Sequence, residues 1–261
     1  ACGFGVRNLD GSPTESTIPA MDLTVQAHSG AMSTTGSEHD PPLKSGTAYI
    51  DFLGGTHLYG AITTALFEVE RTGLGRSVEV AMADAAYFTL ATHLGQWQKT
   101  GATMRNGNRH AGLGMAPYNV YECVDGHLAI ICVTNRHWRA LLGVIGREDL
   151  LEDDRLQEQL GRAGNMAEVD ALVTDWSSKF PKFEAAAMLQ NAHVPAAAVR
   201  TVDEIVHDVD QIDRKAIQWI NHPELGDIPL HTSPIRWHDS EVTELVANRP
   251  LGADNSILDD L

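Results

Sequence analysis

A single acid, Asp51, follows a proline-rich segment and precedes a helical pattern in the stretch PPLKSGTAYIDFLGGTH, residues 41–57. An Asp at a helix start is first of all a cap, which stabilises the helix by about 1 kcal/mol by accepting hydrogen bonds from free backbone N–H groups. A carboxylate can also attack an activated acyl group, because it is ionised at neutral pH and needs no base. Two roles are therefore open for Asp51, cap and nucleophile.

Gly54 and Gly55 fall in the first turns of the same helical pattern. Each Gly costs a helix about 1 kcal/mol relative to Ala, so a pair of them needs a reason. Close approach of a ligand or of another backbone would be one. The positive end of the helix dipole favours an anion or a developing oxyanion. The N–H groups at this helix start are therefore candidates to hold an anion or an oxyanion.

Other side chains could contact a ligand, although each has a simpler explanation. Lys44, Arg105 and Arg109 are candidates for phosphate contacts, with solvated surface charge as the alternative. His110 and His137 could act as bases or ligands, but the chain contains 12 histidines and single ones are uninformative. The three cysteines lack the CxxC spacing of metal ligands, and no histidine accompanies them at such intervals, so we expect no metal site.

The elements that must position Asp51 can be read from hydrophobic spacing. Apolar residues at 58, 62, 66 and 69 predict a helix over 52–71, ended by Gly73, with Asp51 at or near the N-cap. The alternation in SVEVA, residues 77–81, predicts a short strand, and 82–98 is again helical in pattern. A strand between two helices favours an α/β fold class.

The amino-acid composition changes after Trp97. Glycines are frequent there and apolar residues are few, which predicts a loop or linker. Two strand-like runs around Asp125-Gly126 then predict a β-hairpin. Helical patterns follow over 136–145, 165–179 and 182–192, and again from 201 onward. We therefore expect four regions: the latter part of a large α/β domain containing Asp51 (1–90), a linker (91–111), a small α+β domain (112–200) and a segment returning to the large domain (201–261).

Composition excludes several classes of partner. The formal net charge is -16 and the pI is about 5.0, whereas nucleic-acid or anionic-membrane binding would need a dominant basic surface. The longest apolar run, LAIICV at 128–133, is far shorter than the ~20 residues of a membrane-spanning helix. No secretory signal precedes GFG, and three cysteines suit reduced core thiols. These features favour the cytoplasm.

Several segments together resemble, in the right order, the sequence blocks of one family, the class III CoA-transferases with their acyl-CoA racemase relatives (CaiB/BaiF). The resemblance spans almost the whole chain. It implies a Rossmann-like large domain, incomplete here, with a smaller α+β domain, in an interlocked homodimer. The blocks are GFG (3–5), DLTVQAHSGAMSTTG (22–36), PPLKSGTAYIDFLGG (41–55), RTGLGRSVEVAMADA (71–85), APYNVYECVDGHLAI (116–130), VIGREDLLEDDRL (144–156), HVPAAAVRTVDEI (193–205), NHPELGDI (221–228) and PLGADNSIL (250–258).

In that family the acid of the IDFLGG block is the catalytic carboxylate, which is Asp51 here. By resemblance, Asp51 attacks an acyl-CoA thioester to give a mixed anhydride, then an aspartyl-CoA thioester, from which CoA passes to a carboxylic acid acceptor. CoA and acyl-CoA are thus substrates, and no metal takes part. The resemblance also implies that the CoA thioester lies beside these residues: Ala20, Met21, Asp22, Gly54 and Gly55.

Two alternatives remain open. The racemase branch uses a His followed by Asp in the block PAMDLTVQA, but Met21 occupies the His position and a thioether cannot exchange a proton, which favours the transferase. The family's section before GFG is absent, and residues 106–114 replace a poly-glycine loop with different spacing. The chain could therefore be a non-catalytic fragment or subunit in which Asp51 only caps its helix, and the acceptor acid stays open.

Overall fold

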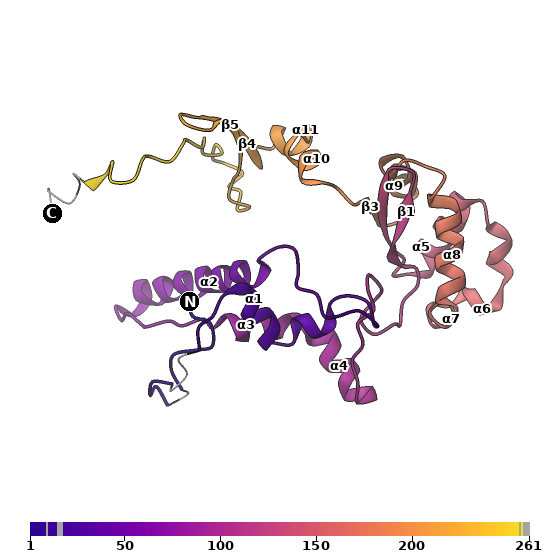
Figure 1. The fold of residues 1–261 in the computed structure, drawn as a ribbon, viewed down its shortest axis with the longest axis horizontal. Helices are drawn as coiled ribbons and strands as arrows, with labels where there is room; N and C mark the ends of the chain where they lie inside the picture. Colours follow the sequence, from indigo (N-terminus) through magenta and orange to yellow (C-terminus); the bar gives the residue numbers. More distant parts are fainter. Residues whose placement is uncertain (9, 15–17, 256, 258–261) are drawn as a thin grey trace. The chain divides into compact units, whose positions relative to one another are not determined.

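The computed structural model describes residues 1–8, 10–14, 18–255 and 257, and the chain divides into two compact units, Ala1–Ala198 and Val199–Leu261. The N-terminal part of the first unit is helical (Figure 1). Its elements are α1 (Asp22–His28), the 3-10 helix η1 (Ala31–Thr34), α2 (Tyr49–Thr72), α3 (Met82–Thr89) and α4 (Ala91–Thr100).

The long helix α2 confirms the helix predicted over 52–71, but it begins three residues earlier, at Tyr49. Its N-cap is Ala48, and Asp51 occupies the third helical position, so Asp51 lies near the N-cap, as expected, but is not the cap itself. The physical reason is that another side chain, from α1, caps this helix. At the other end Gly73 adopts the left-handed conformation with φ 72° and donates its N–H to the carbonyl of Val69, as a C-terminal glycine does.

The strand predicted at 77–81 does not form a ladder. Its end makes an isolated parallel bridge between Ala81 and Cys2, with the Cys2 N–H donating to the Val80 carbonyl at 3.0 Å and the Met82 N–H donating to the Cys2 carbonyl at 2.8 Å. An alternating pattern becomes a strand only when a neighbour pairs with it over several residues. Among the described residues, Cys2 pairs with the end of this segment alone.

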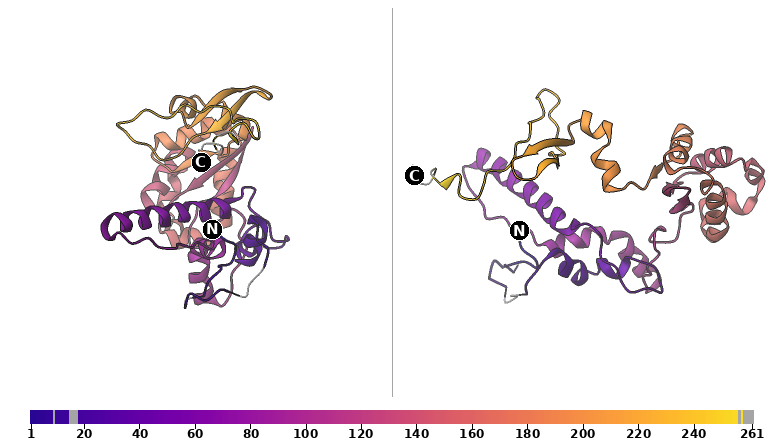
Figure 2. Two further views of the ribbon diagram at one scale, coloured as in Figure 1. Left: turned by 90° about the vertical axis from the view of Figure 1, so that its left-hand side faces the viewer. Right: turned by 45° about the horizontal axis from the view of Figure 1, so that its top comes forward.

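Helices α1, α2 and α3 pack against one another around a small core (Figures 1 and 2). Its buried members are Val25, Ile50, Ala83 and Ala86. The helical pattern over 82–98 is confirmed, although it is divided at Leu90 into α3 and α4. Helix α4 therefore lies within the range 91–111 that was predicted as a linker. The segment without helix or strand runs from Gly101 to Pro117.

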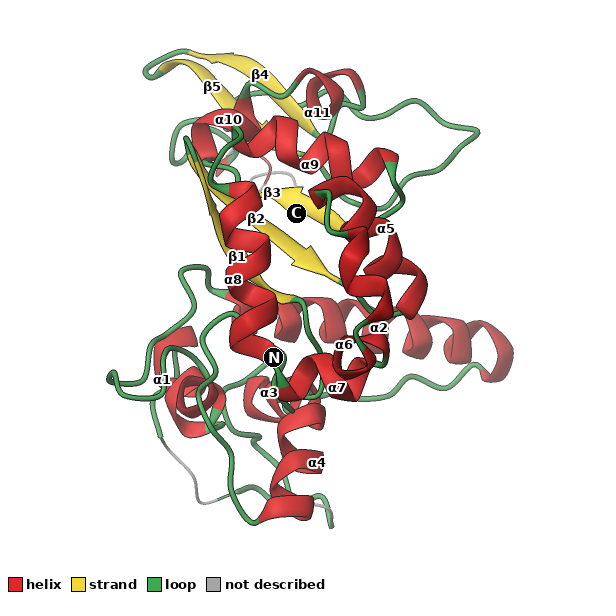
Figure 3. Cartoon of the chain, turned by 90° about the vertical axis from the view of Figure 1, so that its right-hand side faces the viewer, coloured by secondary structure: helices red, strands yellow, loops and turns green. Residues whose placement is uncertain are grey.

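The rest of the first unit is an antiparallel sheet covered by helices. Strands β1 (Tyr118–Cys123) and β2 (Gly126–Ile131) form the predicted hairpin, with Cys123 opposite Gly126, and β3 (Ala196–Ala198) joins the other edge of β2. Figure 3 shows α8 and α9 in front of this sheet. The helices of this part are α5 (Asn135–Ile145), the 3-10 helix η2 (Glu148–Glu152), α6 (Asp154–Gln157), α7 (Gln159–Gly164), α8 (Met166–Ser177) and α9 (Lys182–Asn191).

A buried arginine ties the loop before β1 to these helices. The Arg162 guanidinium is fully buried and donates to the carbonyls of Ala116, Leu156 and Gln157 at 2.8 to 3.1 Å, and to the side-chain oxygen of Asn135 at 3.0 Å. Since unpartnered buried carbonyls would be costly, this side chain stabilises the end of the loop that leads from α4 to the sheet.

The second unit contains two short helices and a hairpin. Helices α10 (Val202–Val206) and α11 (Val209–Asp213) confirm the helical pattern after 201, and each starts at a side-chain cap, Thr201 and Asp208. Strands β4 (Ile217–His222) and β5 (Gly226–His231) then form a two-stranded antiparallel sheet, which was not predicted from the sequence within the segment 201–261. No helix in the described part of either unit is long and apolar enough to cross a membrane.

Candidate active site

The carboxylate of Asp51 is exposed at the start of α2. Among the residues that the structure describes, no group donates a hydrogen bond to this carboxylate or forms an ion pair with it. Its place in the first turn puts it near the positive end of the helix dipole. Asp51 is thus a free carboxylate on a rigid helix, as a nucleophile would have to be.

Asp22, the first residue of α1, caps the helix that contains Asp51. Its Oδ1 atom accepts hydrogen bonds from the backbone N–H of Ile50 at 2.9 Å and from that of Asp51 at 3.3 Å. These are two of the candidate donors to an oxyanion, but Asp22 already occupies both. Tyr49 supplies the first-turn N–H that no described acceptor engages.

The buried amide of Gln26 supports Asp22 from one turn further along α1. The side chain is 1% exposed, and its Nε2 donates to the Oδ2 of Asp22 at 2.5 Å. The Gln26 Oε1 accepts the backbone N–H of Ser45 at 2.9 Å. Both oxygens of the Asp22 carboxylate are therefore engaged, and α1, the segment before α2 and the first turn of α2 are joined in one hydrogen-bonded network.

The two glycines have different surroundings. A Cβ on Gly54 would lie 3.0 Å from the Cγ of Met82, so Gly54 is buried against α3 and permits the close packing of α2 and α3. A Cβ on Gly55 would meet nothing within 4 Å, and this residue is exposed. Packing explains the first glycine, whereas the second leaves open space beside the first turn.

The remaining residues expected near CoA lie at the start of α1. A Cβ on Gly3 would fall 2.0 Å from the Cβ of Ala20, so Ala20 packs against the GFG segment. Met21 is the N-cap of α1, and its side chain is 73% exposed. Because Asp22 follows directly and contacts the first turn of α2, Ala20, Met21 and Asp22 are brought to the same end of α2 as Asp51.

Sequence reasoning missed three contributors, namely Gln26, Ser45 and Tyr49. Tyr49 is half-buried, and burial raises the pKa of its phenol, with the nearby Asp22 charge raising the pKa further. One signal was available, since Asp22 and Gln26 are four residues apart and thus neighbours on one face of a helix. Nothing local in the sequence pairs either with Ser45 or Ile50.

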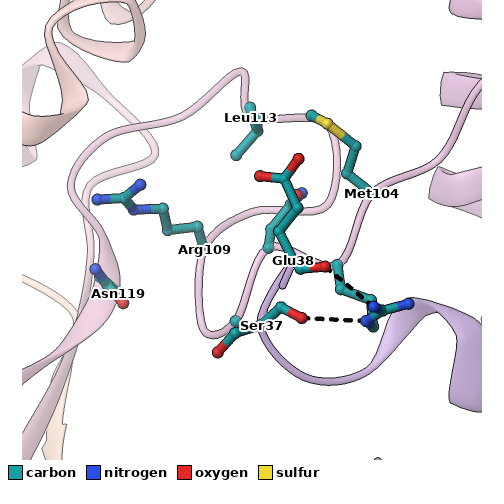
Figure 4. Close-up of a pocket in the computed structure, with 9 residues that line it drawn as sticks. Ser37, Glu38, Met104, Arg109, Leu113 and Asn119 are labelled. Carbon is teal, nitrogen blue, oxygen red and sulfur yellow. Dashed lines mark hydrogen bonds between the residues drawn. The ribbon is translucent and has the colours of Figure 1, made fainter. Parts of the chain in front are cut away.

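The cations considered for phosphate contacts have acceptors within the protein. Lys44 Nζ donates to the Ser45 carbonyl at 2.7 Å, Arg105 donates to three carbonyls in residues 37–40, and Arg109 forms an ion pair with Asp170 at 2.7 Å. A cavity of about 290 Å³ is lined by Ser37 and Glu38 and by the segment that carries both arginines. Figure 4 shows Arg109 and Asn119 on one side of it and Met104 on the other.

The histidines singled out from the sequence also have structural explanations. His110 packs edge-on against Tyr118, and its Nδ1 accepts the Gly112 N–H at 3.2 Å. His137 lies in α5, whose N-cap Thr134 accepts its backbone N–H. Within the described ranges no cluster of three or more His, Cys, Asp or Glu side chains could hold a metal ion.

The family model described as CoA-transferase family III matches residues 2–255. The chain belongs to CoA-transferase family III. It is 29% identical over 271 residues to formyl-CoA:oxalate CoA-transferase of Streptomyces avermitilis, covering 97% of this chain and 64% of that protein. It is 36% identical over 188 residues to acetyl-CoA:oxalate CoA-transferase of Acetobacter aceti, covering 71% of this chain and 48% of that protein.

The fold of this family III chain matches a solved CAIB/BAIF family protein from Brucella suis. The TM-score is 0.78 at 25% identity, over 99% of this chain and 66% of that one. The α/β fold class and the family expected from the sequence are thereby confirmed. The chain spans less than two thirds of the length of the Streptomyces relative.

Proposed function

We propose that the protein containing this chain is a CoA-transferase in which Asp51 is the covalent nucleophile. The observation that carries the proposal is the exposed carboxylate of Asp51, free of protein partners among the described residues and fixed on a helix whose first turn another acid caps. A carboxylate used only as a cap would accept backbone N–H groups. Here Asp22 has that role and Asp51 is left for chemistry.

The first half-reaction transfers CoA to the enzyme. An Oδ atom of Asp51 attacks the thioester carbonyl of the donor, and the tetrahedral intermediate expels CoA thiolate to leave a mixed anhydride. The thiolate then attacks the aspartyl carbonyl of the anhydride and expels the donor acid as a carboxylate. The product is an aspartyl-CoA thioester, and no proton is gained or lost.

The second half-reaction repeats these steps with another acid. The acceptor carboxylate attacks the aspartyl thioester carbonyl, CoA thiolate leaves, and an anhydride between Asp51 and the acceptor forms. Attack of the thiolate on the acceptor carbonyl gives the new acyl-CoA and regenerates the Asp51 carboxylate. The free backbone N–H of Tyr49 and the helix dipole are the first-turn groups available to stabilise the oxyanions.

The thioester lies, in this proposal, on the open side of Gly55, where no side chain of the described chain fills the space. Ala20, Met21 and Asp22 border the same end of α2, whereas Gly54 acts through packing. Burying a ligand beside exposed backbone strengthens the electrostatic attraction between the developing charge and the dipole. The names of the relatives make oxalate, formate and acetate the acids to try first.

We also propose that the protein is an interlocked homodimer. Large apolar side chains are exposed along α2, which is unusual for a helix that faces water. Phe52 is 70% exposed and Phe67 is 63% exposed. A second copy that wraps this helix would bury them, and equilibrium sedimentation would measure the dimer. The three free cysteines suit a reducing compartment and hence the cytoplasm.

Hydroxylamine trapping tests the covalent mechanism. We expect the protein, incubated with acetyl-CoA or formyl-CoA and then hydroxylamine, to contain a hydroxamate at Asp51, located by mass spectrometry of the digested chain. Asp51→Asn would form none. Turnover without modification of Asp51 would overturn the proposal, and exchange of the substrate α-hydrogen with deuterated water would instead indicate the racemase.

A further inference from the structure

We propose that Gln26 is a positioning residue for the reaction at Asp51, an inference that rests on the function proposed above. Gln26 does not touch the substrate, because its side chain is 1% exposed. It acts through Asp22, whose carboxylate it holds in the orientation that caps α2. The role is therefore to fix where the first turn of α2, and with it Asp51, lies.

The hydrogen bonds leave the Gln26 amide a single productive orientation. Its Nε2 must face the Asp22 carboxylate, because an amide oxygen in that place would oppose a carboxylate oxygen at 2.5 Å. Its Oε1 must face the Ser45 N–H at 2.9 Å. A neutral side chain with one donor end and one acceptor end fits both contacts, and a buried polar group that lost either would be left unsatisfied.

A shift of Asp22 would reach Asp51 directly. The Asp22 Oδ1 accepts the N–H of Asp51 itself as well as that of Ile50. If the carboxylate rotates, the first turn of α2 loses its cap and can fray. A nucleophile displaced by about 1 Å loses orders of magnitude in rate, while binding of a substrate held by other residues changes little.

Substitution of Gln26 by Glu turns this geometry into a pH-dependent one. The ionisable groups on α1 are Asp22 and His28, and Lys44 lies in the segment before α2. The ionisable groups on the two helices packed against α1 are Asp84 and Tyr87 on α3, and Tyr49, Asp51, His57, Tyr59, Glu68, Glu70 and Arg71 on α2. Of these described groups, Asp22 contacts the amide. Two carboxyl groups in contact share one proton, so a protonated Glu can donate to Asp22 as the amide does, whereas an ionised Glu repels it.

The experiment measures kcat and KM of wild type, Gln26→Glu and Gln26→Met between pH 5.5 and 8.5, with acetyl-CoA or formyl-CoA as donor and oxalate as acceptor. We expect kcat of Gln26→Glu to fall at least tenfold relative to wild type as the pH rises, with KM for the donor within threefold of wild type. Gln26→Met, which keeps the volume but neither hydrogen bond, should lose at least tenfold in kcat at every pH.

Gln218→Glu is the matched control. Its amide, like that of Gln26, makes one donor and one acceptor contact, but it donates to a backbone carbonyl, that of Thr243, and accepts the backbone N–H of Leu245. It lies in the second unit. We expect the same pH profile as for wild type. Circular dichroism at each pH confirms that the variants are folded, and if Gln26→Glu does not fold, Gln26→Met decides the question.

A Gln26→Glu profile parallel to that of wild type, or a Gln26→Met variant with wild-type kcat, would overturn the inference. Neither result affects the proposed function, which depends on the Asp51 hydroxamate in the wild-type protein. Conversely, a wild-type protein that turns over without the hydroxamate would remove the proposed function first. The two failures are therefore distinguishable.

Discussion

The Oδ1 atom of Asp22 lies 3.3 Å from the backbone nitrogen of Asp51, so one acid caps the helix that presents the other. The sequence left two roles open for Asp51, helix cap and nucleophile, and in the structure Asp22 is the cap. Asp22 satisfies backbone donors of the first turn, and the Asp51 side chain is free of them. Substitutions at the two positions should consequently have different signatures in stability and in activity.

Asp51→Asn should abolish turnover and leave stability almost unchanged. We expect at least a thousandfold loss of kcat, because the amide is a poor nucleophile, and a free energy of unfolding within about 0.5 kcal/mol of wild type, as for surface substitutions away from structural contacts. Steady-state kinetics and urea denaturation measure the two quantities. Intact activity would support a subunit in which Asp51 has no chemical role.

Asp22→Ala should reduce both quantities. Loss of a side-chain cap costs about 1 kcal/mol, and here it also frees the first turn of α2. We therefore expect a lower midpoint in urea and at least a tenfold loss of kcat. Asp22→Asn keeps an acceptor oxygen for the N–H groups of Ile50 and Asp51. Its urea midpoint and its kcat should therefore lie between those of wild type and those of Asp22→Ala. A wild-type midpoint for Asp22→Ala would show that the cap contributes nothing.

The glycine pair offers a comparison within one turn of helix. Gly55→Ala should raise the free energy of unfolding by about 1 kcal/mol through helix propensity, because the new Cβ meets open space. Gly54→Ala should be at least about 1 kcal/mol less stable than Gly55→Ala, because its Cβ is forced against Met82 at 3.0 Å. Thermal denaturation of both variants measures the difference, and equal stabilities would contradict it.

The same pair tests where the thioester lies. If it approaches the open side of Gly55, the added methyl group should raise KM for the acyl-CoA donor at least threefold in spite of the greater stability. An unchanged KM for Gly55→Ala would place the thioester elsewhere.

Cys132 should resist alkylation in the folded protein. Burial raises the pKa of its thiol to about 12, although the nearby Arg162 guanidinium opposes the rise. Burial also raises the pKa of Cys123. We expect iodoacetamide at pH 8.5 to modify Cys123 and Cys132 only after denaturation, as mass spectrometry would show, since the thiolate is the reactive form. Rapid labelling of the native protein at Cys132 would contradict the buried environment.

The raised pKa of Cys132 should also make the stability of the fold fall at alkaline pH. As the pH rises from the ordinary thiol value of 9.0 toward about 12, the unfolded chain releases the Cys132 proton and the folded chain retains it. Stability contributed by this thiol is therefore complete below that window and is lost through it. Cys132→Ala should flatten this alkaline decline in urea denaturation experiments.

Local patterns accounted for much of the fold. The spacing of Leu58, Ile62, Leu66 and Val69 located α2, and Asp125-Gly126 located the β1–β2 hairpin, because helices and tight hairpins depend on residues close in sequence. The cap was missed because Asp22 is 29 residues from Asp51 and no periodicity relates them. The strand at 77–81 failed for the same reason, since pairing depends on what the rest of the fold supplies.

The candidate site was predictable in part. Physical reasoning found the helix start and the unusual glycines, while the choice of Asp51 as nucleophile came from the ordered resemblance of whole blocks. Gln26 was not foreseen because a buried glutamine is recognised only once its partners Asp22 and Ser45 are placed around it.

The network of Asp22, Gln26, Ser45 and Asp51 closes within 30 residues of chain, since Asp22 and Asp51 are 29 positions apart. The entropy lost in closing a loop grows only with the logarithm of its length, so contacts at this separation form early relative to those between distant strands. The surroundings of Asp51 should thus assemble as a unit during folding. The first turn of α2 and its cap would then be in place before the strands of the later sheet pair.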